Sequence, residues 1–589
     1  MLAAGFHFGH DASAALIDRD GLVRFLDKER RSRVKQAIGL AARDIEEILP
    51  ETDDVAVGLS VTQELPIFVD PAIDLAVDGA SPTSAAAFLA TLPADHPYRT
   101  RLGWVDVLDA WKGVHAGEGL FTAGGEGGRT MRRKARLVVR GRAFGAGLYQ
   151  HHFLHACYAG WAVSADRPAL VITADGGIGP SYGGGGIYFW RPRERMEVVA
   201  PSDGWAASFY TAVADHLGLG RHGASGGAGK LMGLSPYGSP LYDDHALVGG
   251  YGDVSDGYRL DRNDLISRWL ARFGVSAEAL TAWDRWDPSP PRLVADVAAS
   301  AQLIFERNTL ALAERAIGLA RVAGFPFEAV VLSGGAALNC PANSALEAAL
   351  DVPVLVPPAC NDEGLSIGAA VAAFFDAVGA YPAGPRSYAE AAYIGTDVTA
   401  ASVRGAADRH GFALSADPGL RATARLILEG ELVGLCSGRA EVGPRALGHR
   451  SIVADPASAA AWPSANSLKR REPWRPFAPA VLWDRASVYF DGPAESRFML
   501  FTHRATTGAL PAVTHRDRSS RVQHVSPQTG LLYQLLVELE RTGAPPVLLN
   551  TSFNGPGAPI VDTAEDAFAE ASSLGLRYIL TDWGLFGAS

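Results

Sequence analysis

Two histidines one helical turn apart are the first residues whose type and spacing point to chemistry. The pattern predicts a helix over residues 149–165. His151 and His155 are four residues apart in it, so both imidazoles share one face. Asp175 follows a predicted buried strand, and Asp362 stands where a helix is expected to begin. Together they predict a site for iron, manganese or magnesium. Taken singly, a polar helix face and a helix N-cap explain them as well.

Positive charges in loops rich in proline and glycine form a second group. Residues 441–451 contain Arg445, and residues 469–477 contain Lys469 and Arg475. Guanidinium groups match phosphate oxygens in pairs, and a lysine supplies a point charge. Trp, Phe and Pro are interleaved with these charges, which favours an anion site over a solvated basic surface.

Two strand ends offer further ligand groups. Residues 330–339 read as a buried strand, a Gly334–Gly335 turn and a helix start, an arrangement that lets backbone approach a nucleotide phosphate. Residues 549–555, with Asn550 and Ser552, place short polar side chains after another strand. Such side chains can donate to and accept from a small planar group. Each motif alone is also compatible with an ordinary loop.

The elements that must position these residues alternate between strands and helices, which predicts an α/β protein. The strand–turn–strand of residues 2–26, with His10 and Asp11 in its bend, is echoed over residues 170–190 and suggests a duplicated fold. A chain of 589 residues exceeds a single core, so at least two domains are expected. Residues 382–385 (Pro-Ala-Gly-Pro) are the best candidate linker.

Composition excludes several classes of protein. The net charge is −11 and no basic stripe occurs, which disfavours a nucleic-acid partner. The four cysteines are scattered without a CxxC motif, as expected for thiols in a reducing compartment. No apolar run reaches the ~18 residues that a membrane span needs, and the N-terminus reads as a strand rather than a leader. A cytoplasmic protein with no membrane partner is therefore expected.

Eight motifs, in this order, resemble the carbamoyltransferase family of nodulation-factor and antibiotic biosynthesis, which includes the nebramycin and cephem O-carbamoyltransferases. The matching segments are residues 10–16, 151–155, 229–238, 333–339, 364–370, 443–448, 471–479 and 550–555. The resemblance implies an actin/sugar-kinase-like domain over residues 1–383 and a YrdC-like α/β domain over residues 384–589.

The resemblance also implies an activity. In the family, carbamoyl phosphate and ATP, with Mg2+, give carbamoyl-adenylate and pyrophosphate in the C-terminal domain. The carbamoyl group then passes, in the N-terminal domain, to a hydroxyl of a small molecule. We therefore expect an ATP-dependent O-carbamoyltransferase that acts on a natural product such as an antibiotic, a glycoside or a polyketide.

Site residues follow from motif position within the same resemblance. His151, His155, Asp175 and Asp362 would hold iron(II), or manganese or magnesium in its place. His10 would be the general base, with Asp11 beside the acceptor hydroxyl. Lys230 and Gly176 would contact the substrate. The residues that would bind ATP and carbamoyl phosphate are Lys35, Gly334, Gly335, Asn339, Arg445, Lys469, Arg475, Arg521, Asn550 and Ser552.

Other interpretations remain open at this point. The same fold could belong to a threonylcarbamoyl-type tRNA-modification enzyme, which the lack of a basic stripe disfavours, or to a sugar kinase, which would form ADP. A non-enzymatic, ATP-gated actin-like binding module needs no carbamoyl pocket. Residues 174–179 depart from the usual family motif. The acceptor is not readable from the sequence, and a homodimer is left open.

Overall fold

Two sheets that share the same strand order over five strands form the N-terminal part of the chain. The computed structural model describes residues 1–37, 39–52, 54–60, 67–68, 70, 72–77, 104–105, 132–175, 184–202, 205–220, 227–247 and 262–588. The first sheet has the order β3 (Gly21–Asp27), β2 (Ser13–Asp18), β1 (Leu2–His7), β4 (Val55–Ser60), β9 (Arg142–Tyr149), β8 (Arg132–Val139) and β6 (Ile73–Val77). The second has the order β12 (Glu197–Ser202), β11 (Gly185–Trp190), β10 (Ala169–Ala174), β13 (Ala329–Ser333) and β14 (Val354–Leu355).

The strand pairing confirms the predicted duplication. β1, β2 and β3 are antiparallel neighbours, and β4 lies parallel to β1 on its other side. β10, β11 and β12 repeat this arrangement, with β13 parallel to β10. The α/β class is thus confirmed, and the repeat agrees with the actin/sugar-kinase-like fold that the resemblance implies.

Two apolar helices lie between these sheets. α5 (His151–Val163) is buried along its whole length and packs on β10 and β13, and α11 (Leu365–Val378) packs on β1 and β4. The helices also pack against each other. A Cβ on Gly368 of α11 would lie only 2.2 Å from the Leu154 carbonyl oxygen of α5, so glycine permits the close approach. Their N-terminal ends therefore meet at one point.

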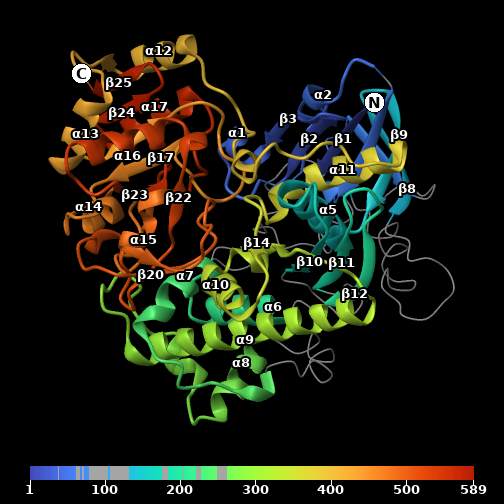
Figure 1. The fold of residues 1–589 in the computed structure, drawn as a ribbon, viewed down its shortest axis with the longest axis horizontal. Coiled ribbons are helices and arrows are strands. Elements are labelled where there is room, and N and C mark those ends of the chain that lie inside the picture. The colour runs from blue at the N-terminus through green and yellow to red at the C-terminus, as the bar shows by residue number, and fades with distance from the viewer. Residues whose placement is uncertain are drawn as a thin grey trace.

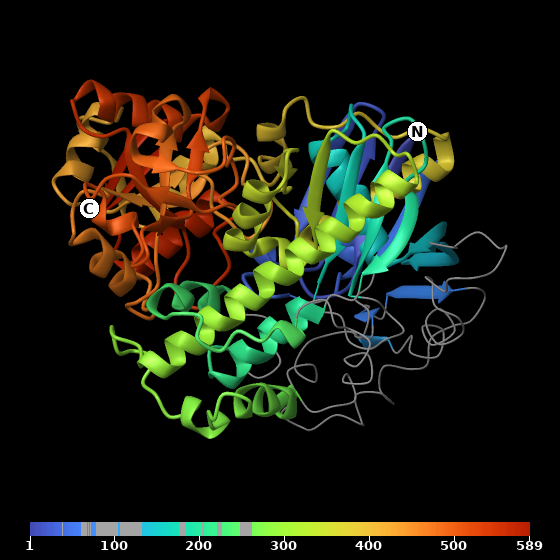
Figure 2. The same cartoon turned by 60° about the horizontal axis from the view of Figure 1, so that its bottom comes forward.

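A third sheet forms the C-terminal part, at one side of the molecule in orange to red (Figures 1 and 2). Its order is β15 (Phe412–Leu414), β25 (Gly584–Ala588), β24 (Tyr578–Thr581), β16 (Val433–Cys436), β17 (Arg450–Ala454), β23 (Val547–Ser552), β18 (Ala478–Leu482) and β22 (Gln523–Val525). Helices α12 (Ala400–Arg409) and α17 (Ala564–Leu574) share one apolar cluster with it. Helices α13 (Leu420–Leu428) and α16 (Leu531–Arg541) share another, so the sheet is covered on both faces.

Further helices join the N-terminal and C-terminal parts. The longest is α9 (Arg292–Val322), which runs beneath both in Figure 1; α6 (Trp205–His216) and α10 (Cys340–Ala349) pack against it. α7 (Ala228–Leu234) continues into η1 (Ser235–Tyr237).

The predicted boundary between residues 383 and 384 falls between α11 and η7 (Tyr388–Ala392). No helix among the described residues is both long and apolar enough to span a bilayer.

Candidate active site: a metal cluster and a cation cluster

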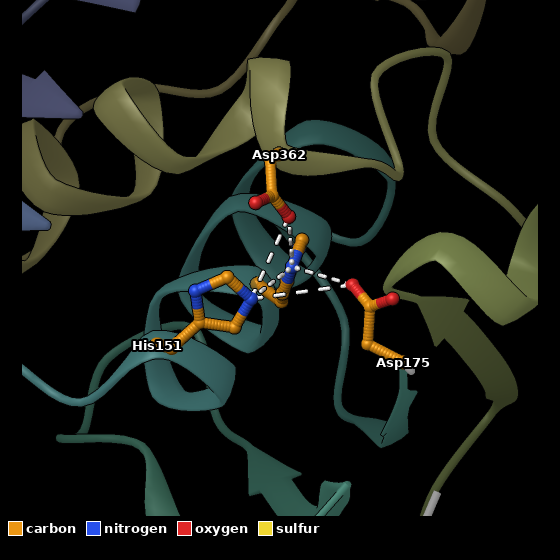
Figure 3. A group of neighbouring side chains, drawn as sticks. His151, Asp175 and Asp362 are labelled. Carbon is orange, nitrogen blue, oxygen red and sulfur yellow. Dashed lines mark hydrogen bonds and ion pairs between the residues drawn. The ribbon is translucent and has the colours of Figure 1, made fainter. Parts of the chain in front are cut away.

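Four predicted residues converge between the first two sheets (Figure 3). His151 and His155 begin α5, Asp175 follows β10, and Asp362 begins η6 (Asp362–Gly364), just ahead of α11. The two Nε2 atoms are 3.2 Å apart. Asp362 Oδ1 lies 3.5 and 3.3 Å from them, and Asp175 Oδ2 lies 4.0 and 3.6 Å from them. We call these four residues the metal cluster.

The metal cluster fits a divalent ion. Ligands about 2.1 Å from a metal lie roughly 3.0–3.4 Å from one another, and the four ligand atoms here all lie within 4.8 Å of one another. Asp362 Oδ2 is also buried without a hydrogen-bond partner. Burial opposes the carboxylate charges, but the histidines outweigh it and hold the pKa values of Asp175 and Asp362 below their usual range. The ionised form is the one that ligates metal.

His10 and Asp11 lie in the turn between β1 and β2, beside the metal cluster. His10 Nδ1 is 3.2 Å from Asp11 Oδ2, and His10 Nε2 is 3.5 Å from Asp362 Oδ2. Burial opposes a charge on His10, but the Asp362 and Asp11 carboxylates raise its pKa to about 10. A protonated imidazole cannot accept a proton. His10 can therefore act as a base only when another cation takes up the Asp362 charge, and that role stays a prediction.

His7 adjoins the metal cluster and was not among the predicted residues. Its Nδ1 lies 3.1 Å from Ser60 Oγ, and its Nε2 lies 2.9 Å from the His10 carbonyl oxygen. Nε2 is also 3.7 Å from Asp362 Oδ2. Burial lowers the pKa of His7 to about 4, so the neutral ring can donate to the backbone of His10 and hold the turn. The signal in the sequence that could have found His7 is that it is a histidine in an otherwise apolar strand.

The Gly334–Gly335 turn meets the metal cluster directly. The Gly335 N–H donates to Asp175 Oδ2 at 3.1 Å. Gly334 has a φ of 88°, and a Cβ there would lie 2.2 Å from the Ala174 carbonyl oxygen. Any other residue would be strained at this position. The turn thus fixes Asp175 while it brings backbone close to the cluster.

An apolar pocket opens beside this turn, between β10, β13 and helices α6, α9 and α10. It encloses about 530 Å³, part of it open to solvent. Its walls include Ile172, Ala174, Phe305, Leu312, Leu332 and Ala336. The apolar walls suit the face of a planar ring such as a nucleobase. The nearby amide of Asn339 caps α10 and bonds to Gln302, so it is engaged within the protein.

The C-terminal part gathers a group of cations, the cation cluster. Its members are Arg445, Lys469, Arg471, Arg475 and Arg521. Burial, reinforced by neighbouring positive charges, lowers the pKa values of Lys469 and Arg471 well below their usual range and that of Arg521 to about 9. Arg445 Nε and Arg521 Nε are buried without hydrogen-bond partners. Such concentrated charge is unfavourable unless an anion binds, so this is a candidate anion site.

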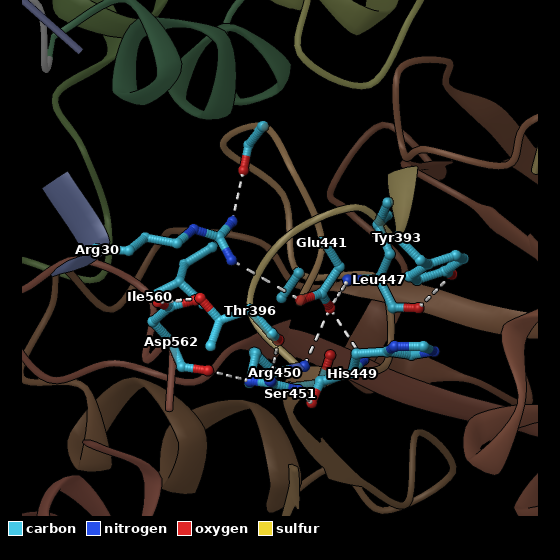
Figure 4. A network of polar contacts seen from close by, with 12 residues as sticks. Arg30, Tyr393, Thr396, Glu441, Leu447, His449, Arg450, Ser451, Ile560 and Asp562 are labelled. Atoms are coloured by element: carbon cyan, nitrogen blue, oxygen red, sulfur yellow. Dashed lines mark hydrogen bonds and ion pairs between the residues drawn. The ribbon is translucent and has the colours of Figure 1, made fainter. Parts of the chain in front are cut away.

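A buried carboxylate organises residues 443–448, the Arg445 loop (Figure 4). One oxygen of Glu441 accepts hydrogen bonds from the backbone N–H groups at positions 447, 449 and 450. Its second oxygen lies 3.9 Å from Arg30 Nη1, and Arg30 Nη2 donates to the Gly443 carbonyl at 2.8 Å. Arg30 belongs to α1 (Lys28–Ser32), so the N-terminal part supports the loop.

Two predicted residues of β23 border the cation cluster. Lys469 Nζ donates to Ser552 Oγ at 3.0 Å. Asn550 donates to the carbonyl of Ala446, in the Arg445 loop, at 3.4 Å, and its Oδ1 is buried without a partner. The structure therefore brings both residues together with the predicted cations.

The remaining predicted residues lie apart from these groups or between them. Lys35 interacts electrostatically with Asp11 on one side and with Lys469 on the other. Lys230 forms a 2.7 Å ion pair with Glu472, a residue that sequence reasoning did not single out. Gly176 lies outside the described residues.

Comparison with known proteins agrees with this arrangement. Residues 145–371 match the family model described as carbamoyltransferase N-terminus, and residues 424–585 match the one described as carbamoyltransferase C-terminus. Nodulation protein NolO of Bradyrhizobium diazoefficiens is 32% identical over 71% of this chain and 75% of its own length. Nodulation protein U of the same organism is 32% identical over 71% of this chain and 73% of its own length.

Solved structures resemble the chain only distantly. An activator of 2-hydroxyisocaproyl-CoA dehydratase from Clostridium difficile, with bound ADPNP, aligns with a TM-score of 0.30 and 11% identity over 64% of this chain and 96% of its own. Full-length HypF aligns with a TM-score of 0.21 and 17% identity over 38% of this chain and 36% of its own. These likenesses are too weak to bear on function. The two family models and the relatives that align along most of their length show that this chain belongs to the carbamoyltransferase family and is an enzyme that transfers carbamoyl groups.

Proposed function

We propose that this carbamoyltransferase activates carbamoyl phosphate with ATP at the cation cluster and transfers the carbamoyl group to a hydroxyl of a small molecule at the metal cluster. The observation that carries the proposal is the pairing of two unlike sites in one chain. One is a buried cation cluster in which the Nε atoms of Arg445 and Arg521 have no hydrogen-bond partner, and the other is a two-His, two-Asp cluster. The first suits phosphate anions, and the second suits a metal ion.

The activation step needs two leaving groups. Carbamoyl-adenylate contains one phosphorus atom, which comes from ATP, so the phosphate of carbamoyl phosphate must also leave. Water cleaves carbamoyl phosphate to carbamate and inorganic phosphate. A carbamate oxygen then attacks the α-phosphorus of ATP and releases pyrophosphate, with Mg2+ on the phosphates. Arg445, Arg475 and Arg521 would hold the phosphate groups, and Asn550 and Ser552 would contact the planar carbamoyl group.

The transfer step belongs to the N-terminal part. His151, His155, Asp175 and Asp362 would hold iron(II) or a similar ion, which would polarise the carbamoyl carbonyl. The apolar pocket beside Gly335 suits the adenine ring of the adenylate. The acceptor oxygen attacks the carbonyl carbon, AMP leaves, and His10 takes the hydroxyl proton.

Pyrophosphate release tests the activation step without knowledge of the acceptor. The purified chain, with carbamoyl phosphate, ATP and Mg2+, should release pyrophosphate and inorganic phosphate in equal amounts, and only when carbamoyl phosphate is present. Arg475→Ala should abolish the release while Arg497→Ala, an arginine elsewhere in the C-terminal part, should retain it. ADP in place of pyrophosphate would instead indicate a kinase. ATP binding without any turnover, even with candidate acceptors added, would contradict the proposed activation step.

A further inference from the structure

Residues 469–477, the cation loop, carry one carboxylate among their positive charges. Glu472 is buried, and its Oε2 atom lies 3.3 Å from Arg475 Nη1. Its Oε1 atom lies 2.7 Å from the Nζ of Lys230, which belongs to α7 of the N-terminal part. Burial opposes a charge on Glu472, but Lys230 and Arg475 outweigh it and hold its pKa below the usual value. Glu472 is therefore ionised and shared by two cations.

We propose that Lys230 is a positioning residue that neutralises Glu472, so that Arg475 stays available to the anionic substrate. The inference rests on the proposed function, because it takes Arg475 to bind carbamoyl phosphate. A carboxylate beside a phosphate-binding arginine competes with the phosphate for the guanidinium and also repels it. Lys230 supplies Glu472 with a second partner and reduces both effects.

The net charge of Lys230, Glu472 and Arg475 determines how much positive charge remains for the substrate. Lys230 and Arg475 are positive and Glu472 is negative, which leaves one positive charge for the substrate. Without Lys230 the group is neutral, and Arg475 is left to pair with Glu472. Without both Lys230 and Glu472 the group regains one positive charge. Removal of the second residue should therefore repair the loss of the first.

Neutral contacts also hold η1 and the segment that precedes α9 against the cation loop. The Tyr237 hydroxyl donates to the Trp474 carbonyl at 3.1 Å, and the Trp474 indole N–H donates to the Arg285 carbonyl at 2.9 Å. The Trp474 side chain is buried. α7 lies beside the C-terminal part in both views (Figures 1 and 2). Because these contacts do not involve the ion pair, they should hold the interface when Lys230 is replaced, and the effect of its charge on the substrate site can be tested.

The test is pyrophosphate release by the full chain, measured against carbamoyl phosphate concentration. Lys230→Met should raise KM for carbamoyl phosphate by about tenfold or more, with a smaller change in kcat, because it leaves a buried charge to compete with the substrate. Glu472→Gln alone, the double variant and Lys230→Arg should each stay within about threefold of the wild-type KM. Lys134→Met removes an exposed lysine of β8 and should change nothing.

Two results would overturn the proposal. A double variant as impaired as Lys230→Met would mean that Lys230 contacts the substrate itself, and an unchanged KM in Lys230→Met would mean that it contributes nothing. A wild-type chain that releases no pyrophosphate would defeat the proposed function instead. In that case calorimetric Kd values for inorganic pyrophosphate, in the same variants, should still rise in Lys230→Met and recover in the double variant; any other order would overturn the inference.

Discussion

At the scale of single residues, Asp362 links the two functions of the N-terminal site. Its Oδ1 atom faces the imidazoles of His151 and His155, and its Oδ2 atom faces His10. One carboxylate thus serves as a candidate metal ligand and as the counter-ion of the proposed base. The state of His10 should therefore follow the occupancy of the metal cluster.

Asp362→Asn should lower the affinity for Fe2+ or Mn2+ by more than about tenfold, because a neutral amide is a much weaker ligand than a carboxylate. Elemental analysis after dialysis at fixed free metal concentration measures the change. Asp351→Asn, at an exposed aspartate between α10 and β14, is the matched control and should bind metal as the wild type does. A wild-type metal content in Asp362→Asn would contradict the assignment.

The members of the metal cluster could be predicted because each has a local signal in the sequence. His151 and His155 share a helix face by spacing, and Asp175 and Asp362 stand at element ends that the hydrophobic pattern reveals. Glu472 could not be predicted in the same way. Its partner Lys230 is distant in the chain, and only the packing of α7 on the cation loop brings the two charges together.

At the scale of elements, the contact between α5 and α11 sets the geometry of the metal cluster. α5 carries both histidines, and Asp362 lies immediately before α11. Gly368 lets the two helices approach closely. A substitution of Gly368 should therefore shift the side chains of the metal cluster, although Gly368 is not one of them.

Gly368→Ala should destabilise the protein by about 1–3 kcal/mol and weaken metal binding, because the new methyl group meets the Leu154 carbonyl of α5. Thermal unfolding and metal titration measure the two effects. Gly318→Ala, in α9, is the matched control: its Cβ meets nothing within 4 Å, so the change should be neutral or stabilise by up to ~1 kcal/mol. Equal behaviour of the two variants would contradict this view of the helix contact.

The repeated strand–turn–strand was visible in the sequence because each copy is continuous in the chain. The order of the C-terminal sheet was not, because its neighbours come from distant segments. β15 pairs with β25 at the far end of the chain, and β16 lies between β17 and β24. Hydrophobic pattern identifies such strands but carries no information on which distant strand lies beside which.

At the scale of the whole molecule, two chemically different sites lie in different parts of one chain. Arg30 supports the Arg445 loop from the N-terminal side, and Lys230 pairs with the cation loop from α7. Lys35 interacts with charges of both sites. These contacts join the two sites, yet each site is built from its own residues. We therefore expect that mutations can separate the activation step from the transfer step.

The most direct test of this account is a comparison of pyrophosphate release by Asp362→Asn and Arg475→Ala, with carbamoyl phosphate and ATP but without acceptor. The account predicts that Asp362→Asn releases pyrophosphate close to the wild-type rate, since activation takes place at the cation cluster. Arg475→Ala should release none. Loss of pyrophosphate release in Asp362→Asn, with Arg475→Ala still active, would contradict the assignment of activation to the C-terminal part.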